Sequence, residues 1–176
     1  MRVQMQHTEE TIQRLSRVQY RTYCTLQRLM TVLTACVLLA LGTVGPFNRA
    51  TSLMLIALGC WTMMSLDVPA DRNAKKLIKS AKGRMPASVF TFSEDAVTIA
   101  GEGEQTVVKY DAFYSLICDG AYLYLFRNRY SAYMVPLDAV ESGSGEELKR
   151  FLAEKTGLTV QKPGSLLRIR FQDLKK

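Results

Sequence analysis

The sequence predicts an α+β protein in which an N-terminal transmembrane helical hairpin precedes a small antiparallel β-barrel capped by a C-terminal helix. Three observations predict this architecture. Two apolar runs, residues 29–48 and 50–66, follow one another with only Arg49 between them. Six segments after Pro86 alternate apolar and polar residues and are separated by turn residues. A helical pattern of apolar residues then follows over residues 146–155.

The two apolar runs are typical of membrane-crossing helices. Residues 29–48 contain no ionisable side chain, and a helix of that length spans ~30 Å, the thickness of a bilayer's hydrocarbon core. Residues 50–66 are fewer and cross a bilayer only without tilt or where it thins. A cleaved signal peptide would be shorter and nearer the N-terminus. A buried helical pair of a soluble protein is the other alternative, and the sequence favours the membrane anchor over both.

Basic residues predict how the anchor is oriented. They lie before the first run and after the second, whereas the connection between the runs carries only Arg49. The positive-inside rule therefore predicts a multi-pass protein of the plasma membrane with both termini in the cytoplasm. The flanking residues are Arg2, Arg14, Arg17, Arg21 and Arg28 before the runs and Arg72, Lys75, Lys76, Lys79, Lys82 and Arg84 after them.

Composition divides the chain into five parts. Residues 1–28 are expected to form a cytoplasmic segment and a helix that continues without a break into the first span. Residues 29–67 form the transmembrane hairpin, in which small residues such as Ala35 favour close packing of the two helices, with packing between protomers as the alternative. A basic juxtamembrane helix follows at 68–86, then the strand-rich domain at 87–157 and a basic tail at 158–176.

The predicted strands of the barrel lie near residues 88–92, 96–100, 105–110, 114–118, 121–126 and 130–135. Their short, even spacing predicts an antiparallel meander that curls into a barrel or a sandwich. The carboxylates Asp95, Asp111 and Asp119 fall at turn positions, where aspartate accepts hydrogen bonds from the backbone. In the fifth strand, the leucines are expected to face the core and the tyrosines Tyr122 and Tyr124 to be partly exposed.

Charge is unevenly distributed and argues against nucleic-acid binding. The net charge is +7, yet residues 86–157 hold six basic and eleven acidic residues, a net charge of −5. The basic residues concentrate beside the membrane and in the tail, so the folded domain lacks the basic surface that nucleic acids require. The expected partners are the lipid bilayer and either another protein or a second copy of the chain.

Several segments carry a family resemblance: Phe90-Thr-Phe92 with Glu94-Asp95, Tyr110-Asp111, the aromatic strand at 122–126, and Ala132-Tyr-Met-Val-Pro136. With the apolar runs, this order resembles the YcxB-like family of bacterial membrane proteins. The resemblance implies a two-helix anchor with a cytoplasmic domain of pleckstrin-homology-like (PH-like) architecture, and it implies no settled activity. Family members often have a basic residue after the proline, where this chain has Leu137-Asp138.

A PH-like barrel has seven strands, one more than the meander supplies. Residues 2–6 and residues 166–171 both alternate apolar and polar side chains, so either segment is a candidate for the missing strand. The tail is also compatible with a basic amphipathic helix on the membrane surface.

No catalytic constellation is expected, because His7 is the only histidine and no nucleophile is paired with a base. No cofactor or metal is expected either, since Cys24, Cys36, Cys60 and Cys118 lack metal-ligand spacing, and Cys24 is either an inert thiol or a juxtamembrane lipidation site. The expected function is a membrane-tethered binding or scaffolding module rather than an enzyme. One alternative is recognition of anionic lipid headgroups, for which the candidate residues are Lys75, Lys76, Lys79, Lys82, Arg127 and Arg129. Another is an accessory subunit of a transporter.

Overall fold

The computed structural model describes residues 1–80, 87–101, 104–141 and 143–164. Within it the chain divides into two compact units. The first unit comprises residues 1–15 and 76–163, and the second comprises residues 16–75 with the segment that begins at Gly164. The divisions fall inside two helices, α1 (Glu9–Tyr23) and α4 (Val68–Ser80).

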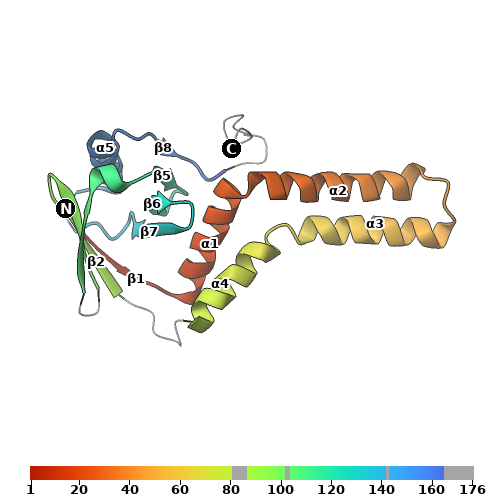
Figure 1. Ribbon diagram of the computed structural model, residues 1–176, viewed down its shortest axis with the longest axis horizontal. Helices are drawn as coiled ribbons and strands as arrows, with labels where there is room; N and C mark the ends of the chain where they lie inside the picture. Colours follow the sequence, from red (N-terminus) through yellow and green to blue (C-terminus); the bar gives the residue numbers. More distant parts are fainter. Residues whose placement is uncertain (81–86, 102–103, 142, 165–176) are drawn as a thin grey trace. The chain divides into compact units, whose positions relative to one another are not determined.

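The first unit contains two four-stranded sheets (Figure 1). One sheet has the order β1-β2-β3-β4, and every neighbouring pair in it is antiparallel. The other has the order β7-β6-β5-β8, in which β8 lies parallel to β5. The first sheet comprises β1 (Arg2–Gln6), β2 (Ala87–Phe92), β3 (Ala96–Ala100) and β4 (Gln105–Lys109). The second comprises β5 (Ser115–Cys118), β6 (Tyr122–Asn128), β7 (Ser131–Pro136) and β8 (Val160–Gln161).

The two sheets share one apolar core. Several strands alternate buried and exposed residues, as in β1, where Val3 and Met5 are buried between exposed polar neighbours, whereas β6 buries four residues in succession, Leu123 to Phe126. Aromatic rings join the sheets, because Tyr133 of β7 makes edge contacts with Phe90 of β2 and with Phe113. Such pairs add stability beyond the apolar area that they bury.

Helix α5 (Gly145–Thr156) closes this core, as the sequence predicts. Leu148 and Leu152 are fully buried, and Phe151 makes an edge contact with the Tyr110 ring. The helix begins with a capping box in which Ser144 Oγ accepts from Glu147 N–H and the Glu147 carboxylate accepts from Ser144 N–H. It ends at Gly157, whose φ of 65° lies in the left-handed region that glycine adopts without strain.

The prediction of one closed barrel is wrong for the residues that the structure describes. The six predicted strands are present, but β4 and β5 do not pair, because a 3₁₀ turn, η1 (Tyr110–Ala112), separates them and directs the chain into the second sheet. Residues 2–6 do supply an extra strand, β1, which pairs along its whole length with β2. The candidate strand at 166–171 lies outside the described residues.

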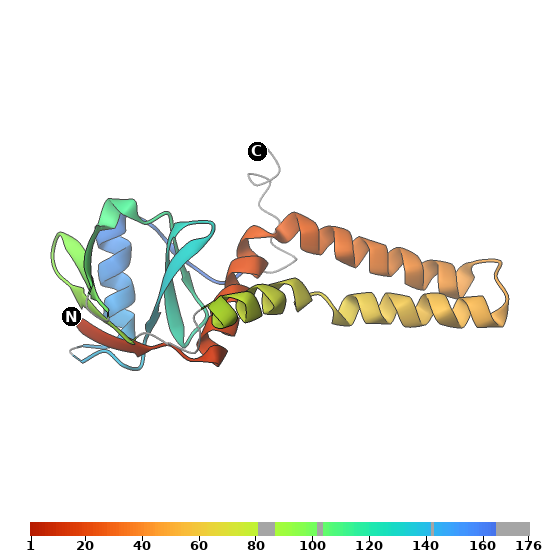
Figure 2. The same cartoon turned by 60° about the horizontal axis from the view of Figure 1, so that its bottom comes forward.

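The second unit contains α2 (Thr25–Val44) and α3 (Arg49–Met64), which lie side by side in both views (Figures 1 and 2). Glycines allow the close approach. A Cβ added at Gly42 would lie 2.8 Å from Ile56 Cγ1, and one added at Gly59 would lie 2.8 Å from Leu39 Cγ. Ala35, which the sequence singles out as a packing residue, is fully buried.

The prediction of one unbroken helix from the N-terminal segment into the first apolar run is wrong. Helix α1 ends at Tyr23, and Cys24 has non-helical backbone angles before α2 begins at Thr25. Exposed ion pairs of Arg17 with Asp71 and of Arg21 with Asp67 join the last turns of α1 to the start of α4.

Candidate functional site

The surface of α2 and α3 is strongly apolar. Helix α2 is long and apolar enough to cross a membrane, and only 17% of its most apolar window is buried. Helix α3 is shorter, and α4, which follows it after a short break, is bent from it by 47°. Large apolar side chains on both helices are exposed, and they include Met30, Leu33, Val37, Leu53, Leu58 and Trp61. An apolar surface this continuous is typical of lipid contact rather than of contact with water.

The predicted lysines lie on one face of α4. Lys75, Lys76 and Lys79 are all exposed, whereas Ala70 and Ala74 on the opposite face are buried. Lys82 lies outside the described residues. The acidic residues near the start of the helix are engaged with α1, and the hydrogen bond from Arg21 holds the pKa of Asp67 below its ordinary value despite partial burial. The exposed face of α4 is therefore cationic.

The predicted arginines lie together at a second place, the turn between β6 and β7. Arg127 follows Phe126, the last buried residue of β6, and Arg129 lies in the turn. Both arginines are exposed. The Asn128 side chain shapes this turn by accepting hydrogen bonds of 2.8 Å from the N–H groups of Tyr130 and Ser131. Tyr130 is 87% exposed, so the tip presents an aromatic ring beside two guanidinium groups.

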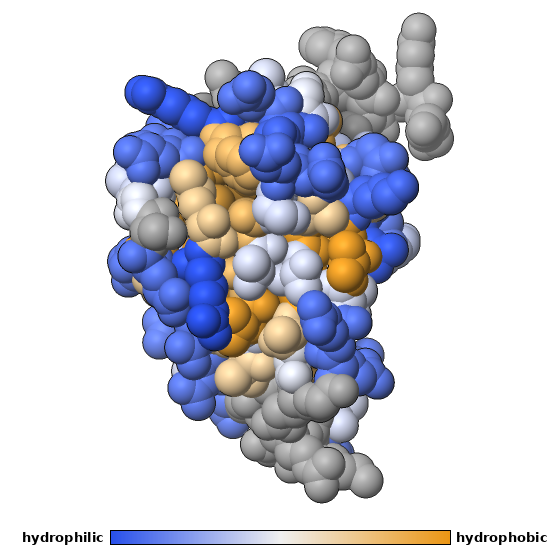
Figure 3. All heavy atoms as spheres, turned by 90° about the vertical axis from the view of Figure 1, so that its left-hand side faces the viewer, coloured by the Kyte–Doolittle hydropathy of each residue, from blue (hydrophilic) through white to orange (hydrophobic). Residues whose placement is uncertain are grey.

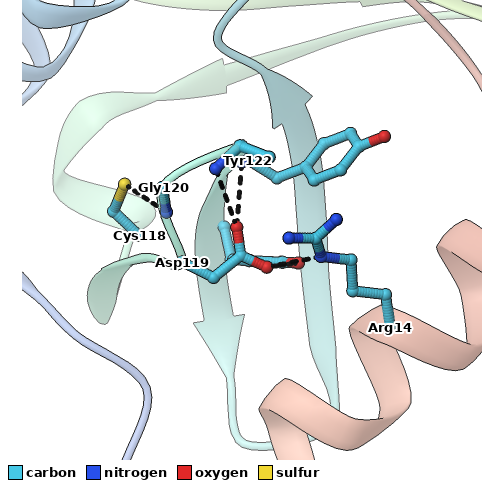
Figure 4. A network of polar contacts seen from close by, with 7 residues as sticks. Arg14, Cys118, Asp119, Gly120 and Tyr122 are labelled. Carbon is cyan, nitrogen blue, oxygen red and sulfur yellow. Dashed lines mark hydrogen bonds and ion pairs between the residues drawn. The ribbon is translucent and has the colours of Figure 1, made fainter.

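A network of polar contacts in the first unit centres on Asp119, in the turn between β5 and β6 (Figure 4). One carboxylate oxygen accepts from the N–H groups of Ala121 and Tyr122, as the sequence predicts for a turn aspartate. The other oxygen accepts from Arg14 Nε and from the Tyr124 hydroxyl, both at 2.7 Å. The Arg14 guanidinium also lies over the Tyr122 ring, 4.9 Å from its centroid.

The prediction that Tyr124 is partly exposed is wrong, because its side chain is fully buried. Its hydroxyl tolerates burial since Asp119 accepts its hydrogen bond. Burial and this bond together raise the pKa of Tyr124 far above its ordinary value. Burial alone would raise the pKa of Asp119, but the hydrogen bonds from Tyr124, Tyr122 N–H and Arg14 outweigh it and lower that pKa. The carboxylate is therefore ionised at neutral pH.

Sequence reasoning identified the Asp119 turn but missed Arg14. These residues are 105 positions apart, and the sequence predicts Arg14 only as one of several basic residues that precede a membrane-spanning helix. Only the pairing of β5 with β6 and the position of α1 bring them together.

An open cavity of about 490 Å³ lies beside the same turn, lined by residues that include Cys118, Gly120, Lys149, Gln161 and Lys162. Lys149 Nζ is 2.6 Å from a Glu146 carboxylate oxygen, and this hydrogen bond raises the pKa of the lysine. No group of three His, Cys, Asp or Glu residues arranged to hold a metal occurs in the described part of the chain.

Comparison with family models matches residues 92–154 to the model described as "YcxB-like protein". The match runs from the last residue of β2 into α5, and all of it lies in the first unit. It supports the resemblance drawn from the aromatic strand and the segment before Pro136. Searches of curated proteins and of solved structures found no match.

Proposed function

We propose that this chain is a YcxB-like membrane protein in which α2 and α3 cross the plasma membrane and the two-sheet unit binds or scaffolds a protein partner at the cytoplasmic face. We further propose that this unit has a PH-like architecture, in which two sheets enclose one core and a C-terminal helix caps it. The observation that carries the proposal is the exposed apolar surface of α2 and α3, which belong to one compact unit of the chain while both sheets belong to the other.

The orientation rests on the flanking charges. The exposed lysines of α4 directly follow the second apolar run, and Arg14, Arg17 and Arg21 precede the first. The connection at residues 45–48 carries no charged side chain. Retention of basic residues in the cytoplasm therefore favours cytoplasmic termini and an external connection.

Epitope tags test this topology. One tag is placed at the C-terminus and another in the connection at residues 45–48, in the full chain expressed in bacterial cells. We expect antibody to reach the connection in spheroplasts with an intact inner membrane, and to reach the C-terminus only after permeabilisation. A C-terminus that is labelled from outside intact cells contradicts the proposal.

Purification in mild detergent tests the binding role. We expect a second protein to co-purify with the full chain in stoichiometric amount, or the chain to assemble with itself. A chain recovered alone and monomeric, from cells in which it is expressed at its natural level, contradicts a scaffolding role.

A second candidate function is recognition of anionic lipid headgroups, and the cationic face of α4 favours it. Each basic residue near an anionic surface contributes about 1 kcal/mol to binding. The net charge of −5 over residues 86–157 opposes such binding by the two-sheet unit itself.

Hydrogen exchange on the full chain in nanodiscs separates the two candidates. Headgroup recognition predicts slower amide exchange in α4 when the nanodiscs contain phosphatidylglycerol than when they contain only phosphatidylcholine. Substitution of Lys75, Lys76 and Lys79 by Gln should abolish the difference, whereas substitution of Lys109 on β4 should not. Equal exchange in both lipids excludes this second function.

A further inference from the structure

Strand β4 ends the first sheet with an open edge. In the described residues, β4 pairs with β3 on one side and with no strand on the other. The opposite edge strand, β1, is covered in part by a bridge between Val3 and Val140. The β4 edge lacks proline, a bulge and an inward-pointing charge, three of the features that prevent an edge strand from pairing, and Lys109 at its end is the one protective charge in the strand.

The hydrogen-bond register shows which backbone groups this edge presents. Gly101 N–H donates to the Glu104 carbonyl, so these two residues form a hydrogen-bonded pair of the β3–β4 ladder. Such pairs alternate along antiparallel strands, so Thr106 and Val108 direct their backbone groups towards β3. Gln105, Val107 and Lys109 therefore direct their N–H and C=O groups away from the sheet.

We propose that β4 pairs antiparallel with β4 of a second copy of this chain, about a two-fold axis at Val107. This inference rests on the proposed membrane anchoring, which holds copies in one bilayer in the same orientation and so raises their effective concentration. With Val107 opposite its own copy, Gln105 lies opposite Lys109. All three residues with outward-facing backbone groups then form hydrogen-bonded pairs. The β1-β2-β3-β4 sheets of the two copies thereby join into one continuous sheet.

Side chains support this register. Val107 is 62% exposed at the centre of the strand, and the two-fold pairing buries it against the same residue of the second copy. Gln105 and Lys109 lie on the same face of the strand as Val107. Antiparallel pairing about Val107 therefore places Lys109 of one copy opposite the uncharged Gln105 of the other, whereas in-register parallel pairing would place the two Lys109 side chains beside each other.

The surrounding surface is also compatible with association. Figure 3 shows the side of the molecule that lies at the left in Figure 1. Apolar and weakly polar side chains lie in the middle of this side, with hydrophilic ones around them. On the outward face of the sheet, Val107 lies beside Thr98 of β3, and Thr98 lies beside Thr91 of β2, so the three residues form a row across the strands. No charged side chain interrupts this row between β2 and the edge.

Sedimentation of the full chain in density-matched detergent tests the proposal. We expect the wild-type chain to form dimers and Val107→Lys, which places like charges opposite each other, to raise the dimer dissociation constant roughly tenfold or more. Gln105→Lys, which sets two lysines opposite each other, should weaken the dimer, and Gln105→Glu, which sets a glutamate opposite Lys109, should strengthen it. Thr91→Lys is the matched control, because it adds the same charge to an exposed position on the same face away from the edge.

A monomeric wild-type chain overturns the proposal, and so does a dimer that Val107→Lys leaves unchanged, because such a dimer forms through another surface. Circular dichroism of each variant establishes that it is folded. Alkaline carbonate extraction tests the membrane anchor separately from the dimer. A Val107→Lys chain that no longer forms dimers but still resists extraction has lost the strand pairing and kept the anchor. A chain that carbonate releases contradicts the anchor and not the edge pairing.

Discussion

At the scale of single residues, Asp119 supports more of the fold than its turn position suggests. It binds two backbone N–H groups, the Tyr124 hydroxyl and Arg14 at once. The Arg14 side chain is 40% exposed, so solvent screens that ion pair and it contributes little to stability. The bond to the fully buried Tyr124 is the important one, because a buried hydroxyl without a partner is costly.

We therefore expect Asp119→Ala to lower the free energy of unfolding by about 1–3 kcal/mol, since it removes the carboxylate that accepts the hydrogen bond of the buried Tyr124 hydroxyl. Tyr124→Phe combined with Asp119→Ala should cost less than the two single changes added together. Urea unfolding of the full chain in detergent, followed by circular dichroism, measures both. Asp138→Ala, at an exposed position, serves as the control, and additive costs would show that the bond is unimportant.

The ionisation of Asp119 predicts a pH dependence. Its pKa in the folded chain lies below its ordinary value of 3.8, so the ionised form stabilises the fold at every pH above that value. The stabilisation is lost as the pH falls through the lowered pKa. The difference in unfolding free energy between wild type and Asp119→Asn should therefore stay constant from pH 7 to about 5 and narrow below about pH 4. A difference that changes between pH 6 and 8 would assign the effect to another group.

At the scale of elements, the contact between α2 and α3 depends on Gly42 and Gly59. The spacing of small residues in the sequence did not predict that these two glycines lie at the contact. Added Cβ atoms at Gly42 and Gly59 would lie within 3 Å of side-chain atoms on the facing helix. Small residues at such contacts let helix backbones approach, and in a membrane close packing replaces the hydrophobic effect as the driving force.

Gly59→Leu should consequently separate the two helices and lower their stability by roughly 1–3 kcal/mol. Ala40→Leu is the matched control, because Ala40 is exposed on α2 and its replacement enlarges only the outer surface. Thermal unfolding in detergent distinguishes the two variants. Equal melting temperatures would mean that α2 and α3 do not depend on this contact.

The sheets show what local pattern predicts well and what it does not. Alternation and turn residues correctly predicted the six strands between Ala87 and Pro136, although alternation of burial is clear only in strands such as β2 and β3, and β6 has four buried residues in succession. The sequence left a barrel and a sandwich both open, because the choice depends on the short 3₁₀ turn at Tyr110–Ala112. Tyr110 looks like the end of a strand, yet its hydroxyl bonds the Ser93 carbonyl and its ring packs on α5.

At the scale of the whole molecule, membrane anchoring makes a prediction that a soluble helical pair does not. Val37 and Leu58 are 56% and 52% exposed. A charge near the centre of a spanning helix costs about 2.5–3.5 kcal/mol. The same change on a water-exposed helix would alter stability by only about 0.5 kcal/mol.

Val37→Glu combined with Leu58→Glu should therefore shift the full chain from the carbonate-resistant membrane fraction to the soluble or aggregated fraction. Tyr130→Glu is the control, because Tyr130 is even more exposed but lies in the two-sheet unit. If the doubly substituted chain stays membrane-integrated, α2 and α3 do not cross the bilayer as proposed.

The sequence by itself determined the α+β class, the two apolar helices, the strand positions, the capping helix and the cationic flank of α4. These features follow from composition and short-range periodicity, which depend on neighbours within a few residues. Only the tertiary structure decided the break at Cys24, the joining of β1 to β2, the separation of two sheets, and the meeting of Arg14, Asp119 and Tyr124. The pairing of β1 with β2 and the cluster of Arg14, Asp119 and Tyr124 join residues far apart in the chain, and such contacts form only once the core brings those segments together.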